Sequence, residues 1–452
     1  MKLSTVFAIF FYNLLMFLPN SPFSLILLTA VLCFNSCTKS ENQTNGKKVS
    51  IERVNGKYTL YKNGKPFTIK GAGGSEHLDV LAEAGGNAIR IWDTIGLKEV
   101  MEQAKLRNLS VIVGLPMPES RFSEYYDSPK ETSKQFNAFK KIVNTYKDHP
   151  SLLMWCVGNE LGFSFNVSNL GFYKQFNNIV DMVHQDDPNH PVTTTLKNLQ
   201  RKELLNLKIR TDVDIVSFNI FGRLSNLRND LDGLSWFWRG PYLVSEWGID
   251  GPWKGTRHTI WSAYLETTSN NKAEQLMERY RKYMPVDDPR FLGSFLFYWG
   301  QKQETTHTWF SIFEEDGSAT EAVSVAKMIW SRKSYSYEFT KIKYMVLNNA
   351  ARENHIFEPQ KTFDAEVLLL KQNPDISKIR WEIYPEDWYK RNNLYNTKKL
   401  KPIESRIIHD ASLQAKFKTP DKEGPYRIFA TIYDKFGNVA TCNIPFYVME
   451  DK

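Results

Sequence analysis

The stretch LLMWCVGNE, residues 152–160, decides the fold of this 452-residue chain. Its first six residues are apolar, and Gly158, Asn159 and Glu160 follow without a break. A strand that is covered on both faces reads as a continuous apolar run, whereas a half-exposed strand alternates. The stretch therefore predicts a buried parallel strand that ends at a polar pair.

Eight apolar runs of this kind occur between residues 67 and 300, and amphipathic segments separate most of them. Eight strand-helix units over residues 67–332 match the roughly 250 residues of a typical TIM barrel. We therefore predict an α/β fold, a (β/α)8 TIM barrel. An open doubly wound sheet is the alternative, which the lack of a G-x-G-x-x-G motif after the first run disfavours. The runs are Phe67–Gly71, Ala88–Trp92, Ser110–Leu115, Leu152–Gly158, Val192–Leu196, Asp214–Phe221, Tyr242–Gly248 and Phe291–Gly300.

Residues 333–452 show a different pattern, in which short apolar runs follow one another without a long helical period. Turn-forming sequences such as Lys422-Glu423-Gly424 separate some of these runs. The pattern predicts a C-terminal immunoglobulin-like β-sandwich of six or seven strands. Before the barrel, residues 37–66 hold a polar tether and a hairpin at Asn63-Gly64.

Residues 1–36 have the pattern of an export signal, with Lys2 as their only charged residue. The sequence PNSP at 19–22 argues against one straight membrane helix, and Phe23–Leu32 has the length of a signal-peptide apolar region. A small serine before Cys37, followed by a polar stretch, resembles the cleavage site of bacterial lipoproteins. The resemblance implies a cleaved signal and a lipidated Cys37 that anchors an exported protein to a bacterial membrane, at the outer membrane or cell surface. A plain secretory signal or an anchor helix is the alternative.

The composition excludes several classes of protein. The 58 Lys and Arg residues exceed the 50 Asp and Glu residues only slightly and are scattered, whereas a nucleic-acid binder gathers its basic residues. Four cysteines without a C-x-x-C pair exclude a disulfide scaffold, and we expect Cys156 and Cys442 to be buried free thiols. No cluster of His and carboxylate residues has metal-ligand spacing, so we predict no metal and no cofactor. The oligomeric state stays open.

Two glutamates lie where a TIM barrel carries its active site, at the C-terminal ends of the strands. The fourth run ends at Glu160, and Glu246 lies near the end of the seventh. Two facing carboxylates are what glycoside hydrolysis requires, because one protonates the leaving oxygen while the other attacks the sugar carbon or activates water. Two unrelated surface glutamates are the alternative.

These residues resemble a known group. An Asn-Glu pair ending the fourth strand and a Glu ending the seventh mark the clan of retaining β-glycosidases built on TIM barrels, which includes the catalytic barrel of family 2 glycoside hydrolases. The resemblance implies that Glu160 is the acid/base and Glu246 the nucleophile. It also implies that Arg90 lies near the nucleophile, that Asn159 binds the sugar 2-hydroxyl, and that Trp299 forms a platform for the sugar.

The chain departs from the clan at two places. Many members have a tyrosine at the end of the sixth strand that donates a hydrogen bond to the nucleophile. Phe221 stands near that position here and cannot donate, so Asn219, Tyr298 or another side chain is expected to substitute. Family 2 enzymes also carry sandwich domains before the barrel, where this chain has only residues 37–66.

Further polar and aromatic residues lie near the same end of the predicted barrel. Glu76, Asp93 and Glu304 follow strands, where carboxylates suit hydrogen bonding to sugar hydroxyls; loop capping is the alternative. Trp247 lies on the seventh run, among tryptophans that cluster around the last two strands. Aromatic faces stack on sugar rings, so we expect some to line subsites and the rest to pack in the core. The other tryptophans are Trp236, Trp238, Trp253 and Trp309.

The combined prediction is a retaining glycoside hydrolase that cleaves a β-linked glycan by double displacement, with a β-glucan, including β-1,3-glucan, as the expected substrate. An exo-acting mannosidase or galactosidase, a transglycosylase, and a non-catalytic glycan-binding lipoprotein on the same fold stay open. The presence of both Glu160 and Glu246 favours an enzyme, since binding alone needs neither. We expect the C-terminal sandwich to brace the barrel rather than to bind sugar.

Overall fold

The computed structural model describes residues 47–253, 255–334, 338–372, 375–386 and 399–450. All of these residues belong to one compact unit. The predicted signal peptide and Cys37 lie outside the described residues. Within the described ranges, no helix is long and apolar enough to cross a membrane.

Eight parallel strands close into a barrel, in which β11 pairs with both β10 and β4. The predicted TIM barrel is therefore confirmed, and the open doubly wound sheet is wrong. The first strand begins two residues later than expected because the backbone N–H of Phe67 bonds to Leu60 of the N-terminal hairpin instead. The strands are β4 (Ile69–Gly73), β5 (Ala88–Ile91), β6 (Ser110–Leu115), β7 (Leu152–Asn159), β8 (Val192–Lys197), β9 (Ile215–Asn219), β10 (Tyr242–Trp247) and β11 (Phe291–Leu296).

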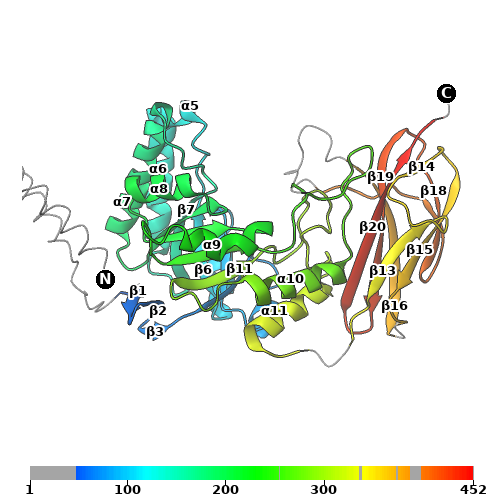
Figure 1. The fold of residues 1–452 in the computed structure, drawn as a ribbon, viewed down its shortest axis with the longest axis horizontal. Helices are drawn as coiled ribbons and strands as arrows, with labels where there is room; N and C mark the ends of the chain where they lie inside the picture. Colours follow the sequence, from blue (N-terminus) through cyan, green and yellow to red (C-terminus); the bar gives the residue numbers. More distant parts are fainter. Residues whose placement is uncertain (1–46, 254, 335–337, 373–374, 387–398, 451–452) are drawn as a thin grey trace, which may run out of the picture. The chain divides into compact units, whose positions relative to one another are not determined.

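Helices follow the strands and pack on the outside of the barrel (Figure 1). The longest begins with a side-chain N-cap, because Ser128 accepts a hydrogen bond from the backbone N–H of Glu131, and Pro129 occupies the first helical position. The helices are α3 (Leu78–Glu83), α4 (Leu97–Leu106), α5 (Ser123–Tyr126), α6 (Pro129–Tyr146), α7 (Leu170–Asp186), α8 (Arg201–Arg210), α9 (Leu227–Asp232), α10 (Ser269–Tyr283) and α11 (Glu321–Ser331), with 3-10 turns η1 (Val167–Asn169) and η2 (Gly222–Asn226).

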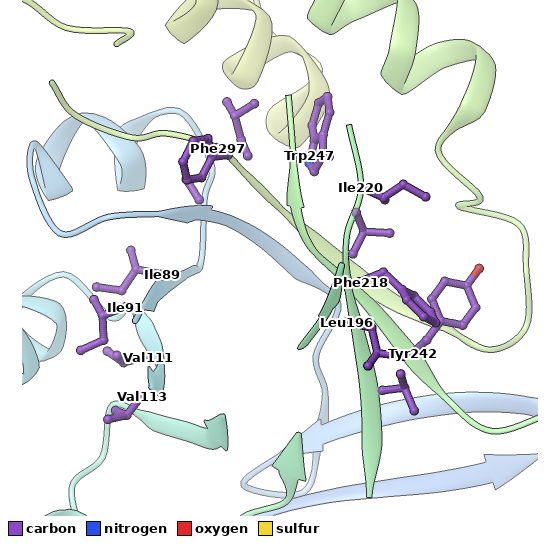
Figure 2. Packing of buried hydrophobic residues seen from close by; sticks show 14 of the residues in the cluster. Ile89, Ile91, Val111, Val113, Leu196, Phe218, Ile220, Tyr242, Trp247 and Phe297 are labelled. Carbon is purple, nitrogen blue, oxygen red and sulfur yellow. The ribbon is translucent and has the colours of Figure 1, made fainter. Parts of the chain in front are cut away.

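The two-residue period of the strands decides which side chains face the barrel interior. Ile89 and Ile91 on β5 lie beside Val111 and Val113 on β6, and all four belong to the core shared with the helices (Figure 2). Because successive side chains of a strand point to opposite faces, Arg90 points into the barrel. The barrel interior therefore contains a buried charge that needs a partner.

A small N-terminal sheet closes the end of the barrel where the strands begin. It consists of β1 (Val49–Val54), β2 (Lys57–Lys62) and β3 (Lys65–Pro66), and all its pairings are antiparallel. Val49 and Leu60 share one apolar cluster with the first residues of several barrel strands. This end of the barrel is therefore apolar and filled, which leaves the opposite end for polar chemistry.

The strands after the barrel form two sheets with a common core. One sheet has the order β13 (Ile342–Leu347), β15 (Thr362–Leu369), β18 (Gln414–Lys418), β17 (Ile407–Ala411), and its strands are antiparallel. Phe417 of this sheet and Ile428 of the other belong to the same buried cluster. The immunoglobulin-like assignment remains a prediction. The second sheet contains β12 (Ala319–Thr320), β20 (Asn438–Val448), β19 (Gly424–Asp434) and β16 (Ile376–Pro385), and β14 (His355–Phe357) pairs with β20.

The two cysteines of the described ranges are Cys156 on β7 and Cys442 on β20. Both are buried and free, as expected. Burial raises the pKa of the Cys442 thiol well above its usual range, so this thiol stays protonated at neutral pH.

Candidate active site

A cavity of about 330 Å³ opens at the C-terminal ends of the barrel strands. It brings together five of the residues singled out from the sequence, Asn159, Glu160, Asn219, Glu246 and Glu304. These residues come from β7, β9, β10 and the loop after β11. Its full lining is Trp92, Asn159, Glu160, Lys197, Asn198, Asn219, Phe221, Gly222, Arg223, Glu246, Asp250, Gly251, Trp253, Phe297, Lys302 and Glu304.

The carboxylate of Glu246 is held by two donors on β5 and just after it. Arg90 donates from Nη1 to Oε1 of Glu246 over 2.5 Å, and Trp92 donates from Nε1 to the same oxygen over 2.7 Å. Arg90 is 1% exposed and Glu246 is 6% exposed. A buried ion pair with added hydrogen bonds gives the carboxylate a fixed orientation at the cavity.

The backbone around Glu160 turns sharply at the end of β7. Gly158 has φ 72°, and a Cβ at this position would lie 2.3 Å from the Leu161 side chain, so only glycine fits. Glu160 itself has φ 53°, in the left-handed region that non-glycine residues rarely adopt. Its side chain accepts a 2.9 Å hydrogen bond from Nδ2 of Asn219, and Nζ of Lys197 lies 3.8 Å from its Oε2.

A continuous chain of hydrogen bonds joins the two glutamates. Oδ1 of Asn159 accepts from Nη2 of Arg90 over 2.6 Å and from Nδ2 of Asn219 over 3.1 Å. Arg90 and Asn219 in turn bind Glu246 and Glu160, respectively. The four strands that carry these residues therefore position both carboxylates through one network.

The glutamates of the cavity differ in their surroundings. Burial raises the pKa of Glu160, and the negative charge of Glu246 raises it further, while the Asn219 hydrogen bond and the Lys197 charge oppose both effects. Burial also raises the pKa of Glu304, and Lys302, whose Nζ lies 3.5 Å from Oε2 of Glu304, opposes this shift. The site thus combines one arginine-bound carboxylate with two carboxyl groups whose pKa values are raised by burial.

Besides Arg90, which contacts Glu246 instead, four predicted site residues do not line the cavity. Trp299 is fully buried, donates from Nε1 to the backbone oxygen of His77, and packs against Trp330, so it has no free face for a sugar. Trp247 is also buried and packs against Tyr280. The platform role predicted for Trp299 and the subsite role predicted for Trp247 are therefore inconsistent with their positions.

The remaining two, Glu76 and Asp93, bond to loop backbone. Oε2 of Glu76 accepts from the N–H of Gln301 over 3.0 Å, and Oδ1 of Asp93 accepts from the N–H of Ile95 over 2.8 Å. Loop capping, which the sequence left as the alternative, describes both contacts.

The aromatic faces at the cavity come from other positions. Trp253 lines it, is 45% exposed, and stacks on Phe310 with 5.7 Å between ring centroids. Phe221 and Phe297 line the same cavity. Of the tryptophans that cluster near the last strands, only Trp253 is among the lining residues.

The sequence reasoning missed several cavity residues, among them Lys197 beside Glu160, Lys302 beside Glu304, and Trp92. Trp92 supplies the hydrogen bond to Glu246 that Phe221 cannot supply, whereas Asn219 binds Glu160 and Tyr298 packs against the Trp92 ring. The alternation of β5 was a usable signal, because Trp92 stands two residues after Arg90 and shares its face.

In the ranges that the structure describes, no group of three or more His, Cys, Asp or Glu residues could hold a metal ion.

One comparison with known proteins matches a family over most of the barrel. Residues 78–283 match the family described as glycosyl hydrolases family 2, TIM barrel domain. A comparison with curated protein sequences found no match. The match to family 2 covers Arg90, Glu160 and Glu246 and supports a glycoside hydrolase.

Similar solved structures include an endo-β-1,4-mannanase from Thermotoga petrophila, with 12% identity, coverage of 86% of this chain and 99% of that chain, and a TM-score of 0.43. A β-glucuronidase from Bacteroides uniformis has 14% identity and a TM-score of 0.47, and the match covers 89% of this chain and 48% of that chain. A family 2 β-galacturonidase from Eisenbergiella tayi has 15% identity and a TM-score of 0.49, and the match covers 64% of this chain and 55% of that chain. The chain thus spans about half the length of the last two proteins.

Proposed function

We propose that this chain is a retaining glycoside hydrolase that cleaves a β-linked glycan, with Glu160 as acid/base and Glu246 as nucleophile. The observation that carries the proposal is the pair of glutamates at one cavity, joined through Arg90, Asn159 and Asn219. Burial raises the pKa of Glu160, which suits an acid that must be protonated near neutrality, and Glu246 is paired with Arg90, which suits a nucleophile that must be ionised.

The reaction has two displacements. Glu246 attacks the anomeric carbon while Glu160 gives its proton to the departing glycosidic oxygen, which forms a covalent glycosyl-enzyme. Glu160, now ionised, takes a proton from water, whose oxygen attacks the anomeric carbon and releases Glu246. Retention requires carboxyl groups about 5–5.5 Å apart, whereas inversion requires about 6.5–9.5 Å.

For the substrate we propose a β-glucan, including β-1,3-glucan. The Trp253 ring offers a face for a sugar, and Asn219 and Glu304 offer hydrogen-bonding groups at the cavity. Mannosides, galactosides and transglycosylation stay as alternatives, because loop shape decides among them. A purely glycan-binding protein is disfavoured, since binding alone does not need a carboxylate held by both Arg90 and Trp92.

We also propose that the protein is exported and lipidated at Cys37, and that residues 333–452 form an immunoglobulin-like sandwich. The lipidation rests on the sequence resemblance alone. Cys37→Ala should move the protein from the membrane fraction to the soluble fraction in the native host, because the acyl chains supply the membrane affinity. Continued attachment of the variant to membranes would contradict lipidation.

Replacement of the nucleophile tests the reaction class. Glu246→Gln should lower hydrolysis of the preferred substrate roughly 10³-fold or more, since the covalent step is lost. The measurement is product sizing on β-1,3-, β-1,4- and mixed-linkage glucans, extended to mannan and galactan. Glu99→Gln, at an exposed position of α4 outside the cavity, is the matched control.

Two outcomes would count against this mechanism. Activity on no β-glycan in the wild type, or activity that survives Glu246→Gln, sinks the proposal. NMR of the first-formed product separately tests stereochemistry, because a retaining enzyme yields the β-anomer first and an inverting one the α-anomer.

The pH profile tests the role of Glu160. The group must be protonated for the first step, so kcat/KM should fall as pH rises through its pKa, which burial raises. Lys197 lowers this pKa, so Lys197→Met should raise it and move the basic limb to higher pH. Lys105→Met, on α4 away from the cavity, should leave the limb in place. If the basic limb of the pH profile moves to lower pH in Lys197→Met, the catalytic acid is a group other than Glu160.

The hydrogen bond from Trp92 predicts a moderate loss of rate. Trp92→Phe keeps an aromatic ring and removes Nε1–H. We expect kcat/KM to fall roughly tenfold, since a hydrogen bond to a charged group contributes about 1.5–3 kcal/mol and part of this also stabilises the free enzyme. Trp236→Phe, at an exposed tryptophan, is the control. Equal rates for Trp92→Phe and wild type would show that Trp92 does not orient the nucleophile.

A further inference from the structure

The loop after β11 is the most polar buried segment near the cavity. Residues 301–311, called the cavity loop here, place Lys302 and Glu304 at the cavity. Residues 303–311 are all buried, although most of them are polar. Burying polar groups is unfavourable unless they find hydrogen-bond partners, so something must hold this loop in place.

One set of partners comes from the segment before α10 and its first turns. Glu266 accepts hydrogen bonds from Oγ1 of Thr306 over 2.6 Å and from Oγ1 of Thr308 over 2.8 Å. Nζ of Lys272 donates to Glu266 over 2.5 Å and to the backbone oxygen of Thr308 over 2.7 Å. Burial alone would raise the pKa of Glu266, but the charges of Lys272 and Arg427 outweigh it and hold this pKa at about 2.

A second set of partners comes from the C-terminal sheets. Arg427 on β19 is 1% exposed and donates from Nη2 to the backbone oxygen of Tyr264 over 2.7 Å. Its Nε binds Glu386 over 2.5 Å, and its Nη1 binds Asn443 on β20 over 2.6 Å. Nδ2 of Asn443 reaches Oγ1 of Thr308 over 3.4 Å. The sheets thus contact both the cavity loop and the segment that binds it.

The most direct contact is aromatic. The ring of His307, in the cavity loop, lies 4.8 Å from the ring of Tyr384 on β16 and 4.4 Å from the ring of Phe429 on β19, measured between centroids. Burial lowers the pKa of His307 to about 4, so this ring is neutral at physiological pH and acts by packing. Tyr384 and Phe429 are called the aromatic clamp.

The segment that follows the cavity loop, residues 312–320, also contacts the C-terminal sheets. Glu314 accepts a 2.7 Å hydrogen bond from Nη2 of Arg380 on β16. A few residues later, Ala319 and Thr320 pair with β20. The segment that carries Lys302 and Glu304 is therefore held by the C-terminal sheets from His307 to Thr320.

We propose that the C-terminal sheets are a positioning element for substrate binding, in which the aromatic clamp on His307 fixes the cavity loop so that Glu304 and Lys302 stand at the cavity. This inference rests on the proposed hydrolase function for its kinetic part. It assigns His307, Tyr384 and Phe429 as positioning residues, since they act on substrate through Glu304 and Lys302.

The experiment compares His307→Ala with His307→Phe in the full chain. The phenylalanine keeps a ring for the clamp, whereas the alanine removes it. Hydrogen exchange of peptides covering residues 301–311 should speed up in His307→Ala and stay at the wild-type rate in His307→Phe. On the glycan that the wild type hydrolyses, KM should rise roughly tenfold in His307→Ala with kcat little changed, and His307→Phe should restore it. Leu370→Ala, exposed on the C-terminal part, controls for general effects there.

The outcomes separate the inference from the proposed function. Unchanged exchange in His307→Ala overturns the inference even if hydrolysis is normal, and faster exchange with an unchanged KM overturns the link to the cavity. A wild type that hydrolyses no glycan defeats the proposed function, and the exchange data then decide the loop contact alone. If His307→Ala does not fold, Tyr384→Leu removes one side of the clamp and is judged by the same two measurements.

Discussion

The buried ion pair between Arg90 and Glu246 is the interaction on which the rest of the site depends. Arg90 points into the barrel, where an unpaired charge costs several kcal/mol. The two groups lie 2.5 Å apart, Asn159 accepts a further hydrogen bond from Arg90, and Trp92 donates one to Glu246. Because these partners come from different strands, the site can form only when the barrel closes. The opposite end of the barrel is filled by apolar residues and the N-terminal sheet.

The two catalytic candidates show how one residue type acquires two environments. Glu246 sits in a strand against an arginine, while Glu160 follows a glycine turn in a left-handed backbone conformation and meets only an amide and a more distant lysine. Burial without a close cation raises the pKa of Glu160. Backbone strain of this kind persists when neighbouring structure holds it in place, and it clusters at functional sites.

Much of the fold and the centre of the site were predictable from the sequence. Continuous apolar runs marked all eight barrel strands, because a strand covered on both faces leaves no room for alternation. Position along a strand then placed Glu160, Glu246 and Asn159 at one end of the barrel, since parallel strands end on the same side. The turn sequence Gly-Asn-Glu and the alternation around Arg90 are local features, which can be read directly from the order of the residues.

The tertiary structure decided which side chains reach the cavity. Trp92 rather than a sixth-strand residue binds Glu246, Trp299 packs in the core, and Trp253 takes the exposed aromatic position. The same holds for the cavity loop, where Thr308 and His307 contact Asn443 and Phe429, which follow them in the chain by more than a hundred residues. Local pattern reports which elements form and which face a residue occupies, because those depend on near neighbours. Contacts across the barrel, or between the barrel and the C-terminal sheets, depend on loop paths and packing, which no short stretch of sequence encodes.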